Sequence, residues 1–190
     1  MKTLELTAYK RETVGKRTTK DLRNEDRVPG VIYTNGNAEH VYLDTIDLKP
    51  VIYTADTYII HLNIDGNTTP VIVRGTDFHP VNGKLLHIEF MSVSDDKAVK
   101  VDLPLKMVGT PAGVTKGGKL AVILRKISVK GIPSHLPEFM EVPVGELDLG
   151  QTIKVQDVDF GDIQIETSPS AGIAAVEIPR ALRSAAAAAS

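Results

Sequence analysis

The sequence of 190 residues contains no cysteine. This absence excludes disulfide bridges, cysteine-ligated zinc, thiol nucleophiles and iron–sulfur clusters. The chain also has no run of about 20 apolar residues, which is the length that a transmembrane helix needs. Its first residues include no apolar stretch typical of a signal peptide, so we expect a protein of the cytoplasm without membrane contacts.

An excess of charge of one sign is also missing. The 22 Lys and Arg residues nearly balance the 24 Asp and Glu residues, which gives a net charge of −2. Residues 9–23 are the exception, because six cations there accompany only two anions. Salt screens distant charges, so a local excess of this kind can attract a polyanion even on a slightly acidic chain. A solvated charged loop is the alternative interpretation, and it is common for charge runs.

Motifs for catalysis are weak or absent. Residues 113–119 match the spacing of a phosphate-binding loop, but Leu120 stands where a Ser or Thr should hold Mg²⁺, so we expect a glycine-rich connection. His79, His87 and Glu89 could form a metal site, yet neither a general base nor a substrate pocket is evident. The sequence also lacks a G-x-S-x-G elbow. We therefore predict that the protein is not an enzyme and has no metal site of its own.

Strands separated by short turns are predicted for most of residues 1–93. Runs with the composition or alternation of strands occur at 4–11, 31–33, 41–43, 58–64, 70–77 and 85–93. Asn35-Gly36-Asn37 and Asp65-Gly66-Asn67 are typical turn sequences.

The last of these strands has a clear alternation. It places three polar or flexible side chains on one face and three apolar ones on the other. The first face carries His87, Glu89 and Met91, and the second carries Leu86, Ile88 and Phe90.

Two short helices are predicted between the strands. The first begins near Thr18, a favourable N-cap residue, and Asp21 would complement its N-terminus. It ends at Val28-Pro29-Gly30. The second, within 44–53, must place Pro50 in its first turn or be broken by it.

Residues after Val93 are predicted to form a second, all-β domain. Its strands are expected at 99–108, 120–127, 141–144 and 173–178, separated by Gly- and Pro-rich turns that favour a sandwich or a barrel. We place the domains at 1–93 and 94–180, and we expect the Ala-rich residues 181–190 to be a flexible tail. The predicted fold class is mostly β with a few short helices, in two domains.

Several stretches in the same order resemble one protein family. They are RETVGK at 11–16, TKDLR at 19–23, VPGVIY at 28–33, HP at 79–80, KLLHIEF at 84–90, VGTPAGV at 108–114, GGKL at 117–120, LPE at 136–138 and LDLGQTI at 147–153. Together they resemble the ribosomal protein L twenty-five family of the bacterial large subunit, in its long form, also called general stress protein Ctc.

The resemblance implies a fold and a function. The N-terminal domain would be a β-barrel that binds 5S ribosomal RNA at the internal loop called loop E, and the C-terminal domain would be an additional β domain. The partners would be 5S ribosomal RNA and other components of the large subunit, with no membrane and no small-molecule substrate. No cofactor is expected, because Mg²⁺ would be associated with the RNA rather than with the protein.

The resemblance also implies the RNA-binding residues. Basic residues flank Gly15 and occupy the short helix, and polar residues lie on the strands that follow. Arg17 stands where a glycine is common and Asp21 where a second cation is common. The implied RNA-binding residues are Arg11, Lys16, Arg17, Thr19, Lys20, Arg23, Tyr33, Arg74, His87 and Glu89.

These residues suit two different tasks. The cations of 11–23 would hold phosphates and dominate affinity, whereas Tyr33, Arg74, His87 and Glu89 would meet base edges or 2′-hydroxyls. Placing a carboxylate such as that of Glu89 against RNA is energetically unfavourable unless a base N–H donates a hydrogen bond to it. Glu89 would therefore disfavour RNA partners that lack such a donor.

Two alternatives remain at this stage. Residues 94–190 carry eleven cations and twelve anions, which gives no basic excess for RNA. The chain could therefore be a protein-interaction or stress-related module whose C-terminal β domain carries the main activity. A metal-dependent enzyme that uses His79, His87 and Glu89 is the other alternative.

Overall fold

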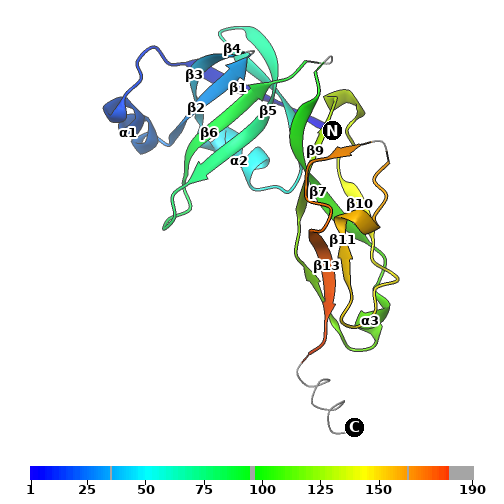
Figure 1. Cartoon of the computed structure of the whole chain (residues 1–190). Coiled ribbons are helices and arrows are strands. Elements are labelled where there is room, and N and C mark those ends of the chain that lie inside the picture. Colours follow the sequence, from blue (N-terminus) through cyan, green and yellow to red (C-terminus); the bar gives the residue numbers. More distant parts are fainter. Residues whose placement is uncertain (35, 95–96, 162, 180–190) are drawn as a thin grey trace. The chain divides into compact units, whose positions relative to one another are not determined.

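The computed structural model describes residues 1–34, 36–94, 97–161 and 163–179, which divide into two compact units. The first unit comprises Met1–Val99 and Ile132–Leu136, and the second comprises Lys100–Gly131 and the described part of Pro137–Ser190. Both units consist mainly of strands with a few short helices (Figure 1). The predicted fold class and the two-domain organisation are therefore confirmed. The predicted tail at 181–190 lies outside the described residues.

Six strands of the first unit form a closed barrel. They are β1 (Lys2–Lys10), β2 (Arg27–Thr34), β3 (Asn37–Asp44), β4 (Tyr58–Ile64), β5 (Asn67–Phe78) and β6 (Leu85–Ser92). Their order around the barrel is β1-β3-β2-β6-β5-β4, and parallel pairing of β1 with β4 closes it. In a closed barrel every strand is hydrogen-bonded on both sides, so no edge is left unpaired. The positions of side chains on the outer face are therefore fixed by the pairing.

Side-chain alternation sorts the barrel residues into a core and an outer face. Ile88 and Phe90 of β6 are fully buried in the core, while His87 and Glu89 are only partly covered. This confirms the predicted face of His87 and Glu89. Leu86 was expected on the buried face, and that prediction is wrong, since Leu86 is only half-buried. The register of β6 with β5 shifts at this residue, and Leu85 occupies the buried face instead.

Tight turns connect the hairpins as the sequence indicated. Between β4 and β5, Asp65 and Gly66 have φ angles of 50° and 89°, the left-handed conformation that a two-residue hairpin turn requires. Gly36, with φ 95°, lies between β2 and β3. Asn35 of that predicted turn lies outside the described residues.

The first helix, α1 (Lys16–Asn24), begins earlier than the sequence suggested. Gly15 is its N-cap, and the prediction that Thr18 caps the helix is wrong. The hydroxyl of Thr18 instead donates to the carbonyl of Gly15 at 3.1 Å, a bond that threonine forms readily inside a first turn. Asp21 consequently lies past the first turn, and the Val-Pro-Gly sequence belongs to β2 rather than to the end of the helix.

The second helix, α2 (Thr45–Ile52), contains Pro50 near its end. We expected this proline in the first turn or at a break, and that expectation is wrong. A proline lacks the N–H that would bond to the carbonyl of residue i−4, here Ile46. Ile46 is 71% exposed, so water can reach that turn and the helix tolerates the loss.

The second unit contains two small sheets and short helical turns. Its strands are β7 (Val99–Val108), β8 (Lys119–Val122), β9 (Lys126–Gly131), β10 (Met140–Pro143), β11 (Thr152–Lys154), β12 (Gln164–Ile165) and β13 (Gly172–Glu177). Among its described residues, the α-helix is α3 (Ala112–Thr115). The described part of the chain also has two 3-10 turns, η1 (Pro133–His135), which lies with the first unit, and η2 (Val155–Asp157). The sheet orders are β10-β7-β9-β12 and β11-β13-β8.

One predicted strand of this unit is in fact two. Residues 120–127 divide into β8 and β9, which belong to different sheets. The chain turns between them because the N–H groups of Ile123 and Leu124 both donate to the carbonyl of Ile173, while Arg125 accepts a bond from Leu105. The short strands β11 and β12 were not predicted.

The glycine-rich segment 113–119 packs tightly and holds no phosphate-loop geometry. A Cβ on Gly113 would lie 2.7 Å from backbone atoms of Asp148 and Leu149, and one on Gly118 would lie 2.6 Å from Val176. Lys116 pairs with Asp148 at 2.6 Å, and this hydrogen bond, followed by one from the Leu149 N–H, lowers the pKa of the Asp148 carboxyl. The glycines therefore permit close packing, as expected for a structural connection.

Candidate nucleic-acid interface

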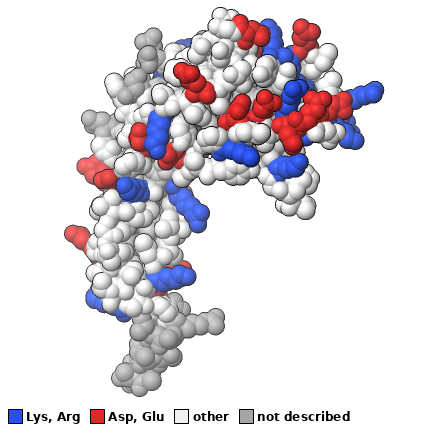
Figure 2. All heavy atoms as spheres, turned by 180° about the vertical axis from the view of Figure 1, so that it is seen from behind, with Lys and Arg blue, Asp and Glu red and all other residues white. Residues whose placement is uncertain are grey.

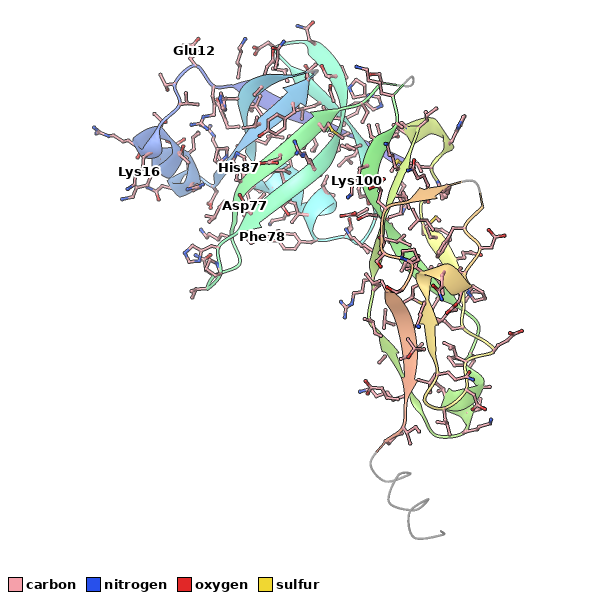
Figure 3. All side chains as sticks on the ribbon, in the orientation of Figure 1. Glu12, Lys16, Asp77, Phe78, His87 and Lys100 are labelled. Atoms are coloured by element: carbon pink, nitrogen blue, oxygen red, sulfur yellow. The ribbon has the colours of Figure 1, made fainter. Side chains whose placement is uncertain are left out.

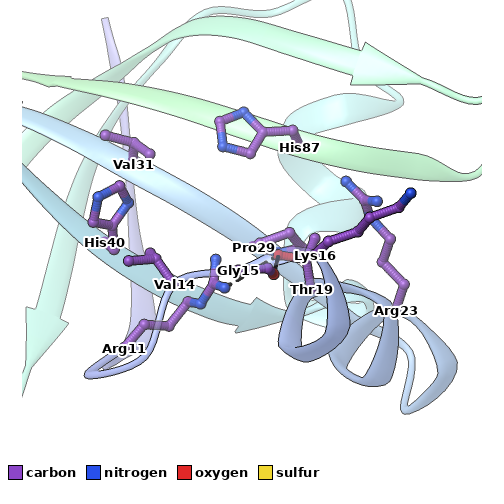
Figure 4. A pocket seen from close by; sticks show the side chains of 10 residues that line it. All are labelled: Arg11, Val14, Gly15, Lys16, Thr19, Arg23, Pro29, Val31, His40 and His87. Carbon is purple, nitrogen blue, oxygen red and sulfur yellow. Dashed lines mark hydrogen bonds between the residues drawn. The ribbon is translucent and has the colours of Figure 1, made fainter.

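Helix α1 lies outside the barrel (Figure 1). A pocket of about 310 Å³ opens between the helix segment and the strands, and Figure 4 shows the side chains that line it. Three cationic side chains, two histidines and a hydroxyl contribute to its wall. The lining residues are Arg11, Val14, Gly15, Lys16, Thr19, Arg23, Pro29, Val31, His40 and His87.

The strand side of the pocket is the outer face of β2, β3 and β6. Val31 of β2 pairs in register with His40 of β3 on one side and with Glu89 of β6 on the other. Val31 is only 8% exposed, so it forms an apolar floor between polar neighbours. His40 and His87 rise from the strands on either side of β2, as Figure 4 shows.

The helix side of the pocket is cationic. Lys16, Thr19 and Arg23 share one stripe of α1 and line the pocket. Lys20 lies at the margin of this stripe, and Arg17 points about 100° around the helix axis from Lys16. Both Lys20 and Arg17 are exposed.

Hydrogen bonds hold the segment that leads into α1. The guanidinium of Arg11 donates to the hydroxyl oxygen of Thr19 at 3.2 Å, and that hydroxyl donates to the carbonyl of Gly15 at 2.8 Å (Figure 4). Arg11 and Thr19 are thus positioned by one another, and the guanidinium keeps other N–H donors for a ligand.

Two β-bulges shape the neighbouring strands. Arg74 is an extra residue on β5, and Leu86 is an extra residue on β6. Between the two bulges lie three paired positions of β5 and β6, which include Gly75 with Glu89 and Asp77 with His87. Their register is offset by one residue from that of the pairs before the first bulge and after the second. Bulges of this kind change which residues lie opposite one another, and here they place Gly75 opposite Glu89 and Asp77 opposite His87.

The bulge at Arg74 brings this side chain over an aromatic ring. Its guanidinium carbon lies 5.2 Å from the ring centroid of Tyr33 on β2, within the range of a cation–π interaction. Gly75, the next residue, lies beside the half-buried Glu89, and a Cβ there would lie 3.6 Å from the carboxylate oxygen, at ordinary contact distance. Tyr33, Arg74 and Glu89 thus share the outer face of the barrel but do not line the pocket.

The structure therefore brings half of the expected residues together at the pocket. Arg11, Lys16, Thr19, Arg23 and His87 line it. Figure 3 shows Lys16 on α1 and His87 on β6. The remaining expected residues lie outside the pocket lining, and they are Arg17, Lys20, Tyr33, Arg74 and Glu89.

Sequence reasoning missed His40 and the apolar floor. His40 comes from a strand with no motif of its own, and only its register opposite Val31 places it beside the pocket. Val14 and Pro29 were likewise not candidates, because apolar residues carry no chemical signal of a site. An alternation argument applied to 37–44 could have placed His40 on the outer face.

The suggested metal site is not formed. Within the described ranges, no three His, Asp or Glu side chains form a group that could hold a metal ion. His79 instead serves its own loop, where its Nδ1 accepts the N–H of Val81 at 3.2 Å. None of the helices in the described part of the chain is long and apolar enough to cross a membrane.

Surface charge is mixed elsewhere. On the face shown in Figure 2, cationic and anionic side chains are interspersed, in keeping with the net charge of −2. Any attraction for a polyanion must therefore come from local groups such as those of α1, because a general positive field is absent.

Comparisons with known proteins cover nearly the whole chain. The model of the Ribosomal L25p family matches residues 6–90, and that of the Ribosomal protein TL5, C-terminal domain, matches residues 98–180. A protein of Amoebophilus asiaticus named Large ribosomal subunit protein bL25 is 38% identical over 187 residues, which cover 98% of this chain and 95% of the relative. The chain belongs to the bL25 family.

Other bL25 proteins are similar over the same extent. The one from Cytophaga hutchinsonii is 35% identical and covers 96% of this chain and 95% of its own. The one from Phocaeicola vulgatus is 36% identical and covers 98% of both chains. Membership in the long-form bL25 family confirms the predicted resemblance and the prediction that the protein is not an enzyme.

Proposed function

We propose that this chain is a structural constituent of the large ribosomal subunit in the cytoplasm, and that its first unit binds 5S ribosomal RNA at loop E. One observation carries the proposal: the cationic stripe of α1 faces the polar outer surface of the barrel across a pocket. Membership in the bL25 family supports the ribosomal context. Loop E as the target rests on the family resemblance.

The cations near α1 suit RNA phosphates. Lys16, Arg17 and Lys20 are exposed, and their side chains form no hydrogen bond or ion pair with any described residue. Arg11 adds a fourth cation with donors to spare. Phosphate contacts dominate the affinity of proteins for nucleic acids and fix their orientation.

The strand face suits the bases of an irregular RNA helix. A regular RNA duplex offers little to read, since its major groove is deep and narrow. An internal loop of non-Watson–Crick pairs widens the grooves and exposes base edges. The face with Tyr33, Arg74, His87 and Glu89 is rigid, because it lies on paired strands of a closed barrel.

A binding titration tests the proposal directly. The full-length protein is titrated with 5S ribosomal RNA in Mg²⁺ and about 150 mM salt, with transfer RNA as the competitor. We expect tight binding that transfer RNA does not displace, and a log–log salt slope of about −3 to −4 if four cations contact phosphates. Equal competition by transfer RNA would reduce the surface to a general basic patch and overturn the proposal.

A further inference from the structure

We infer that Arg23 is a positioning residue, which fixes helix α1 against the barrel and so presents the other cations to the RNA. The inference rests on the proposed function and deepens it. It assigns Arg23 a role different from that of Lys16 and Lys20, although all three are cations of the same short helix.

Helix α1 has almost no apolar anchor. Leu22 is the only apolar residue among its nine, and no residue of the helix is buried. A helix of nine residues is too short to be stable alone in water, so tertiary contacts must hold it. Since apolar burial contributes little here, polar contacts to the barrel must fix the helix.

Arg23 makes the closest polar contact of this kind. Its Nε and one terminal nitrogen donate to the same oxygen, the carbonyl of Leu86 on β6, at 3.1 and 2.9 Å. The contact is partly buried and joins residues 63 positions apart in the sequence. Hydrogen bonds from a charged donor are stronger than neutral ones, and partial burial protects them from water.

The β-bulge explains why this carbonyl is available. Leu86 is the extra residue of β6, so it has no partner in the register with β5. The pairing of β6 with β2 begins only at Ile88. A buried or half-buried carbonyl needs a donor, and the Arg23 guanidinium supplies one. The bulge and Arg23 thus form a single anchor.

Other hydrogen bonds among the described residues hold the two ends of the helix segment. Behind the helix, the carbonyl of Asp26 accepts the N–H of Thr45 at the start of α2. In front, Arg11 bonds to Thr19. Arg23 lies between these ends, so its bond to Leu86 fixes the rotation of the helix that turns Lys16 toward the pocket and leaves Lys20 exposed beside it.

Matched variants separate positioning from phosphate contact. In the full-length protein, Arg23→Lys keeps the charge but cannot supply the paired donors, and Arg23→Gln removes both. Lys20→Gln, on the same helix, is the control for a phosphate contact. Three quantities are measured: the salt dependence of 5S ribosomal RNA binding, amide hydrogen exchange in α1 of the free protein, and the thermal unfolding temperature.

We expect both Arg23 variants to bind about tenfold more weakly with an unchanged salt slope, because a charge-assisted bond is lost while the phosphate contacts remain. Their α1 amides should exchange faster, and the unfolding temperature should fall only by the few degrees that the loss of one hydrogen-bonded contact costs. Lys20→Gln should lower the salt slope by about one unit and leave exchange in α1 unchanged.

Other outcomes would overturn the inference. Normal binding by Arg23→Lys, with a slope lower by one unit in Arg23→Gln, would make Arg23 a phosphate ligand, and the proposed function would stand. A much larger fall of the unfolding temperature in Arg23→Lys, with faster amide exchange throughout the barrel as well as in α1, would indicate a general structural role. If the unaltered protein shows no preference for 5S ribosomal RNA over transfer RNA, the proposed function fails, and the role of Arg23 in RNA binding fails with it.

Discussion

Glu89 is the one acid among the RNA-binding residues expected from the sequence, and we expect it to supply specificity. It is an acid on the outer face of β6, in register with Val31 of the pocket floor and with Gly75 of β5. Phosphates repel a carboxylate, so its presence favours only an RNA that offers a base N–H at that point. Residues 11–23 are expected to provide affinity, whereas Glu89 is expected to exclude wrong partners.

Replacement of Glu89 by Gln tests this division. We expect the preference for 5S ribosomal RNA over a plain RNA duplex to fall by about tenfold, because a charged hydrogen-bond acceptor is lost while repulsion of the duplex is relieved. The two affinities are compared in the same salt. Glu39→Gln, at an exposed position of β3, is the control that changes net charge equally. Equal losses on both RNAs would contradict the proposed role.

At the scale of elements, much of the fold could be predicted from local sequence, but its irregularities could not. Alternation and turn residues predicted β4, the Asp65-Gly66 turn and the outer position of His87. The bulges at Arg74 and Leu86 were missed, because a bulge is defined by the partner strand and not by its own sequence. Consequently the partner of Arg23 was missed too.

The same limit applies to helix and strand ends. Thr18 was a reasonable cap, but two neighbouring hydroxyls compete for the carbonyl of Gly15, and the helix starts before them. The break between β8 and β9 depends on bonds to Ile173 and Leu105, which are distant in sequence. Local propensity cannot reveal such partners.

The connection around Gly113 allows a prediction on the second unit. Gly113→Ala should destabilise this unit by about 2 kcal/mol, because a new Cβ would lie 2.7 Å from backbone atoms that cannot move away easily. Gly145→Ala is the control, since nothing lies within 4 Å of its Cβ position. Chemical unfolding of both variants measures the difference. Equal free energies of unfolding for the two variants would show that the backbone near Asp148 can move to make room for the added methyl group.

At the scale of the whole molecule, two units with separate cores share one chain. The barrel has its own apolar cluster, which includes Phe90 and Ile60, and buried residues such as Leu103, Ile127 and Ile173 belong to the second unit. The candidate RNA-binding groups all lie in the first unit. Sequence reasoning found this organisation because a polar stretch follows the last barrel strand, while the exact boundary of the domains stays a prediction.

Binding of RNA should therefore act unequally on the two units. We expect 5S ribosomal RNA to raise the unfolding temperature of the first unit, because a ligand stabilises the state that binds it. The gain in the free energy of unfolding is roughly 2.7 kcal/mol when the ligand concentration is a hundred times the Kd. The unfolding of the second unit should not change. Calorimetry measures both transitions, and Gly113→Ala identifies that of the second unit. A shift of that second transition would show that RNA also engages the C-terminal domain.

The two bulges together leave the pairing of β5 with β6 unchanged at both ends of the hairpin. They lie on opposite strands of one hairpin, and the second cancels the offset that the first introduces, so the pairing returns to its original register at Phe78 and Leu85. Each bulge carries one contact of the candidate interface, since Arg74 lies over the Tyr33 ring and the Leu86 carbonyl accepts from Arg23. The pair of bulges thus confines the change of register to three residue pairs, and the order of the strands around the barrel stays intact.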